Sequence, residues 1–117
     1  SRLVKGKDGL SLQYPKEPRF TSFTVENCNT LHEDMKYENL CGFFSKYSVK
    51  NGVDFLDKDQ PLFRVVVFVI SESQFAIFCS VSHIVGDGYT FYKLYGMLSE
   101  NVTPVSLISE RNTSYPD

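Results

Sequence analysis

Two apolar segments separated by a very short polar turn constrain the fold of this chain more than any other feature. Residues 62–70 are almost entirely apolar, and residues 74–82 follow them after only three polar residues. A segment that is apolar at nearly every position is typical of a strand covered on both faces. Because two strands joined by so short a turn must pair antiparallel, the sequence predicts a β-hairpin from these two segments.

Further strand and helix patterns surround the hairpin. Residues 19–28 are rich in Phe, Thr and Val and predict another strand. Apolar residues spaced as on one face of a helix predict helices over about 31–47 and 89–100. These stripes are Leu40, Phe43, Phe44 and Tyr47 in the first helix, and Phe91, Leu94, Tyr95 and Leu98 in the second. The pattern indicates an α+β fold, with helices packed on a mainly antiparallel or mixed β-sheet.

The two ends of the chain differ from its centre in composition. Residues 1–18 are polar and interrupted by Gly and Pro, which predicts an irregular N-terminal arm. Residues 101–117 contain Pro, Ser, Asn and Thr and predict an exit linker. The folded part is therefore expected to span residues 19–100, which is enough for one modest core.

Composition and charge disfavour several classes of partner. The formal net charge of -2 and the pI of about 5.6 provide no basic surface for a nucleic acid. No apolar run reaches the roughly 20 residues of a transmembrane helix. The three cysteines form no Cys-x-x-Cys pair and are odd in number, which argues against a disulfide framework or a structural zinc site. A reducing intracellular or organellar compartment is therefore favoured.

The segment from Ser82 to Gly88 carries the titratable residues best placed for chemistry. His83 stands at the end of the second predicted hairpin strand, and histidine exchanges protons near neutral pH. Gly86 and Gly88 allow a sharp turn and a close approach by a ligand. Asp87 precedes the second helix, where it can cap the backbone N–H groups or bind an arginine. The alternatives are a structural histidine and an ordinary turn with a helix cap.

The residues on both sides of this segment indicate a more specific function. Pro61-Leu62-Phe63-Arg64-Val65, the hairpin, and then His83-x-x-x-Asp87-Gly88 with an amphipathic helix together resemble one superfamily. It contains the chloramphenicol acetyltransferases, the condensation domains of peptide synthetases and the plant BAHD acyltransferases. The resemblance covers about residues 57–100. It implies that residues 19–100 form the histidine-bearing half of a chloramphenicol-acetyltransferase-like two-layer sandwich.

The resemblance also implies an activity and roles for individual residues. The activity is acyl transfer from a coenzyme A or carrier thioester to a hydroxyl or amine, with His83 as the general base. Asp87 matches the family aspartate that holds the loop by pairing with an arginine, for which Arg64 is the candidate. Gly88 matches the glycine beside the histidine, and Gly86 supports the same loop. The expected partners are an acyl thioester and a small-molecule acceptor, with no metal and no tightly bound cofactor.

Two departures from the family pattern keep other functions open. Ser82 stands where many members have a second histidine, and 117 residues supply only one of the two halves between which substrates bind. Another domain or protein chain is therefore expected to complete the fold. The main alternative is a non-catalytic structural or binding subunit that retains the half-fold. A further alternative is a peptide- or ligand-binding domain that is unrelated to the family.

Overall fold

A computed structural model describes residues 2–13, 16–17, 22–50, 56–58 and 60–107. The chain divides into two compact units, Ser1–Gly86 and Asp87–Asp117. The half-domain expected over 19–100 therefore extends from the first unit into the second.

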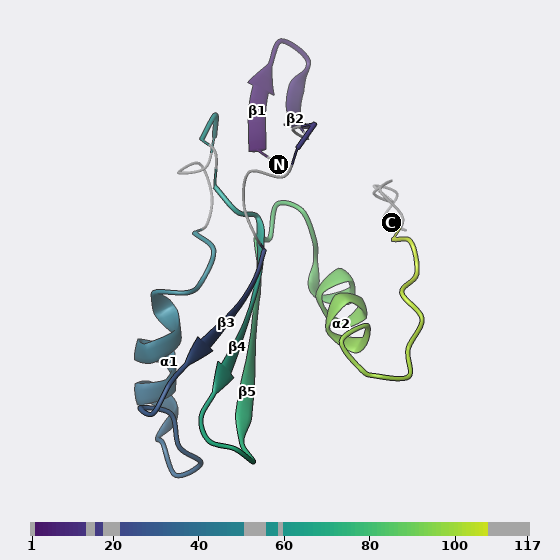
Figure 1. Ribbon diagram of the computed structural model, residues 1–117. Helices are drawn as coiled ribbons and strands as arrows, with labels where there is room; N and C mark the ends of the chain where they lie inside the picture. Colours follow the sequence, from purple (N-terminus) through teal and green to yellow (C-terminus); the bar gives the residue numbers. More distant parts are fainter. Residues whose placement is uncertain (1, 14–15, 18–21, 51–55, 59, 108–117) are drawn as a thin grey trace, which may run out of the picture. The chain divides into compact units, whose positions relative to one another are not determined.

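The first unit contains a mixed three-stranded sheet in the order β3-β4-β5. Its strands are β3 (Phe23–Asn27), β4 (Phe63–Val69) and β5 (Phe75–Val81). Strand β4 lies in the middle, antiparallel to β5 and parallel to β3. The predicted antiparallel hairpin is confirmed. The prediction of an α+β fold with a mainly antiparallel or mixed sheet is confirmed as well (Figure 1).

Helix α1 (Tyr37–Ser45) lies between β3 and β4 in the sequence and covers one face of the sheet. Its aromatic rings pack directly on the sheet. The ring centres of Phe43 and Phe68 in β4 are 5.3 Å apart, and the Phe44 ring stacks on the Phe78 ring in β5 with 4.8 Å between their centres. Val66 and Phe68 are fully buried beneath the helix and, with Leu31, form the core. The helix is shorter than the predicted 31–47, because a turn closed by the bond from the Met35 N–H to the His32 carbonyl precedes it and the helix ends at Ser45.

The opposite face of the sheet is exposed at the end where the β4–β5 turn lies. Phe75 is 66% exposed, Ile77 43% and Val25 59%. These side chains share one face, since Val25 and Ile77 both pair with Val67 in the strand register. Within the first unit α1 covers only one face of the sheet, and the prediction that the apolar strand is covered on both faces stays a prediction.

The irregular arm predicted for residues 1–18 is corrected by the structure. Strands β1 (Arg2–Gly6) and β2 (Gly9–Gln13) form a separate antiparallel hairpin. The turn is possible because Gly9 adopts a φ of 117°, which side chains rarely permit. A bridge between Leu3 and Leu56 and a hydrogen bond from the Asp57 N–H to the Leu3 carbonyl (2.8 Å) connect this hairpin to the chain before β4.

The second unit contains helix α2 (Gly88–Gly96), which starts one residue before its predicted position and ends four residues earlier. Residues 102–107 follow the helix without regular secondary structure, as predicted for a linker, and the rest of the predicted linker lies outside the described residues. The expected packing of this helix on the sheet stays a prediction.

Candidate functional site

A tight turn presents His83 at the end of strand β5. The Ser82 N–H donates to the Leu62 carbonyl at 2.8 Å, which extends the β4–β5 ladder by one pair. The Ser82 carbonyl then accepts a hydrogen bond from the Val85 N–H at 3.0 Å. This bond closes a turn with His83 and Ile84 at its two central positions. The His83 side chain is consequently exposed directly beyond a paired strand.

The imidazole of His83 makes no hydrogen bond with the residues that the structure describes. A general base needs one ring nitrogen free for the proton and benefits when its other nitrogen is held. In the described residues both nitrogens are available, and no group fixes the tautomer. A partner or substrate would have to supply that second contact.

Ser82 anchors the turn from inside the protein. Its side chain is fully buried, and its Oγ has no hydrogen-bond partner among the described residues. A buried hydroxyl without a partner costs free energy, although a bound water molecule can satisfy it. Ser82 therefore fixes the backbone from which His83 projects and is inaccessible to a substrate.

Asp87 caps the helix that follows the motif. Its Oδ1 accepts a hydrogen bond of 2.9 Å from the Thr90 N–H, and its backbone is extended, as expected for an N-cap residue. One of the two roles considered for Asp87, helix capping, is thus confirmed. A Cβ added to Gly88 would meet no atom within 4 Å, whereas Gly86 is buried.

Arg64 interacts with the chain segment that follows α1. Its Nη1 donates to the Tyr47 carbonyl at 3.5 Å, and its guanidinium lies 5.3 Å from the centre of the Tyr47 ring. In the strand register it is opposite Ser80, whose Oγ accepts from the Val49 N–H at 3.0 Å. The expected pairing of Arg64 with Asp87 stays a prediction, because Asp87 belongs to the second unit.

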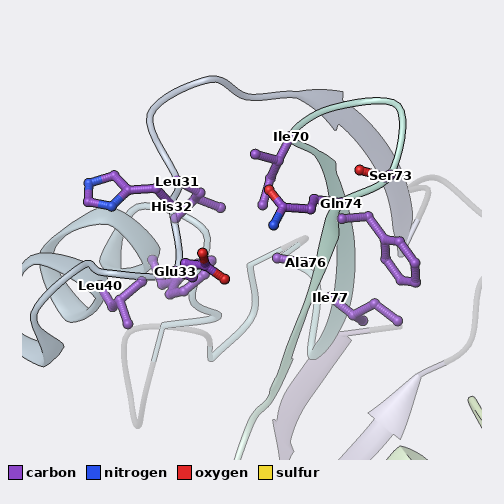
Figure 2. A pocket seen from close by; sticks show the side chains of 11 residues that line it. Leu31, His32, Glu33, Leu40, Ile70, Ser73, Gln74, Ala76 and Ile77 are labelled. Atoms are coloured by element: carbon purple, nitrogen blue, oxygen red, sulfur yellow. The ribbon is translucent and has the colours of Figure 1, made fainter.

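A cavity of about 540 Å³ lies at the other end of β5 (Figure 2). Its apolar walls come from Leu31 and α1 on one side and from the start of β5 on the other. His32 and Glu33 also line it. No local pattern signals this cavity, since its walls are far apart in the sequence.

Cys79 lies in β5, four residues before His83, and is partly buried. Burial raises the pKa of its thiol, because desolvation disfavours the thiolate. The thiol is therefore a weak nucleophile at neutral pH. Within the described part of the chain, no three His, Cys, Asp or Glu side chains gather where they could hold a metal ion.

None of the described helices has the length and apolar character needed to cross a bilayer. Comparisons with family models, with curated proteins and with solved structures find no match for this chain.

Proposed function

We propose that this chain is the histidine-bearing part of an acyltransferase that uses a coenzyme A or carrier thioester. The proposal includes a fold related to half of a chloramphenicol-acetyltransferase-like sandwich, which a second half or a partner chain would complete. One observation carries it. The hairpin ends in a turn that exposes His83, and four residues later Asp87 caps the following helix.

The chemistry requires one proton to be moved twice. A neutral imidazole nitrogen of His83 accepts the proton of the acceptor hydroxyl or amine while its oxygen or nitrogen bonds to the thioester carbonyl carbon. The carbon–sulfur bond then breaks, and the imidazolium returns the proton to the departing thiolate. An exposed histidine on a backbone fixed by the β4–β5 ladder suits this role, since the strand holds the base in place.

The test is thiol release by the full-length protein with acetyl coenzyme A and a set of small alcohols and amines. His83→Ala should lower the rate by about 100- to 10,000-fold, the usual contribution of a general base. His32→Ala is the matched control, because His32 is also exposed and lies outside the motif. An unchanged rate in His83→Ala would exclude His83 as the base.

A second candidate is a non-catalytic binding subunit that keeps the half-fold. The exposed apolar side chains of Val25, Phe75 and Ile77 favour it, since an apolar sheet face of this kind is suited to a protein partner. This alternative predicts a folded wild-type protein that releases no thiol from any donor, with or without the His83 substitution.

A further inference from the structure

The outer edge of β5 has main-chain groups that no described strand uses. The Ser82 N–H bonds to Leu62, and the Ile70 N–H bonds to the Gln74 carbonyl at 3.0 Å. In an antiparallel pair these bonds alternate along the strand, so even-numbered residues of β5 direct their backbone toward β4. The N–H and C=O groups of Phe75, Ile77, Cys79 and Val81 therefore point away from β4.

In the described part of the chain, β5 is the last strand on its side of the sheet (Figure 1). Its sequence, Phe-Ala-Ile-Phe-Cys-Ser-Val, contains no charged residue and no proline. Those are the residues with which edge strands usually prevent pairing with another chain. The edge is thus competent to accept another strand.

The cavity described above adjoins the first half of this edge. Leu40 and Phe44 of α1 form one wall, and Ala76, with its small side chain, forms part of the other. Because side chains alternate along a strand, every second residue of a peptide paired with β5 would point toward this cavity. Its volume of about 540 Å³ accommodates a large apolar side chain.

The rim of the cavity indicates the charge of its ligand. Figure 2 shows the Glu33 carboxylate and the Gln74 amide directed into the space between the two walls. Asp34 follows Glu33 in the sequence, and the chain carries a net charge of -2. A Lys or Arg is the complementary group, whereas an acidic peptide or a nucleic acid would be repelled.

We propose that the outer edge of β5 and this cavity form a binding site for an extended basic peptide of another protein. The peptide adds a strand to the sheet, places one apolar side chain in the cavity, and sets a Lys or Arg against Glu33. This is recognition by β-strand addition, in which backbone hydrogen bonds supply affinity and the pocket supplies specificity. The site lies at the end of β5 opposite to His83 and does not depend on acyl transfer.

The probe is a fluorescein-labelled peptide of seven residues, the length of β5, with the sequence Thr-Lys-Thr-Leu-Thr-Lys-Thr. Its Leu and both Lys side chains share one face of an extended strand. Binding to the complete protein is measured by fluorescence anisotropy. We expect saturable binding with a Kd below about 1 mM. Absence of binding at that concentration would overturn the proposal.

Two methylated peptides test the strand pairing. One carries N-methyl groups on the Lys and Leu amides, and the other carries them on the Thr amides. Only one of these sets can face β5, because the amides of a strand alternate in direction. One methylated peptide should lose binding and the other should keep it. Equal binding of the two would show a ligand held by the cavity alone and would contradict strand addition.

Variants of the protein test the remaining contacts. Glu33→Gln should weaken binding by about two- to fivefold, the range for an exposed ion pair. Glu72→Gln is the matched control, since Glu72 is exposed in the β4–β5 turn and does not line the cavity. Ile77→Pro removes an N–H that points away from β4 and should abolish binding. Equal peptide affinity in Glu33→Gln and Glu72→Gln would overturn the assigned role of Glu33.

Sedimentation identifies the other possible occupant, which is a second copy of this chain. A monomer, or a dimer that the peptide dissociates, supports the peptide site. A dimer that persists at saturating peptide and loses its self-association in Ile77→Pro would assign the edge to self-pairing instead.

Discussion

The Tyr47 hydroxyl donates a 2.7 Å hydrogen bond to Oε2 of Glu26, which joins the segment that follows α1 to the edge strand β3. The Tyr47 ring also lies 4.9 Å from the ring of Phe68, the fully buried residue at the centre of the sheet. A single side chain therefore packs against the core and satisfies a carboxylate at its border. This contact holds helix and sheet together on the face that α1 covers.

Tyr47→Phe should reduce the free energy of unfolding by about 1 kcal/mol at neutral pH, because it removes this hydrogen bond and keeps the ring packing. The bond to Glu26, and then partial burial, raise the pKa of the Tyr47 phenol above its ordinary value. Because the phenol pKa is higher in the folded than in the unfolded protein, the protonated phenol stabilises the folded state at pH values below about 10, the pKa of an unfolded tyrosine. This stabilisation is lost as the pH rises through the pKa of Tyr47 in the folded protein.

The difference in stability between wild type and Tyr47→Phe should therefore shrink above about pH 10. Urea unfolding of both proteins at neutral and at alkaline pH measures it. Glu26→Gln is a second test, since it removes the charge and keeps an acceptor. A difference that does not change with pH would show that the phenol is not responsible.

Asp87→Ala should destabilise the start of α2 by about 0.5–2 kcal/mol, the usual cost of losing an N-cap side chain. The Thr90 N–H loses its acceptor in this variant, so its hydrogen exchange should become faster. Asp87→Asn keeps an oxygen at the same position and is the matched control. Unchanged exchange at Thr90 in Asp87→Ala would contradict the capping role.

Phe68 and Phe75 provide a matched pair of substitutions in neighbouring strands. Phe68 is fully buried, and Phe68→Ala should cost about 3–5 kcal/mol through lost transfer energy and a new cavity. Phe75 is 66% exposed, and Phe75→Ala should change stability by less than about 0.5 kcal/mol. Thermal unfolding followed by circular dichroism measures both. A comparable loss in the two variants would indicate that a partner covers the outer face of the sheet in solution.

Strands β4 and β5 could be predicted from the sequence alone. Continuous apolar runs with a three-residue turn leave an antiparallel hairpin as the only short connection, and β4 and β5 form it. Apolar residues at helical spacing correctly predict both helices. The observed ends of the helices differ from the predicted ends by up to six residues, because local hydrogen bonds set where each helix begins and ends. The N-terminal hairpin also has a local signal, the Asp8-Gly9 pair followed by the alternating Leu10 and Leu12.

Local periodicity predicts the strands β3, β4 and β5 and the helices α1 and α2, because each depends on residues close together in the chain. It also placed His83 beyond a strand and Asp87 before a helix. Contacts between distant segments set the parallel pairing of β3 with β4, the packing of α1 on one face of the sheet, and the placement of Glu33 and Gln74 around one cavity. These features join residues far apart in the chain. No local pattern encodes them, since they arise when α1 packs on one face of the sheet.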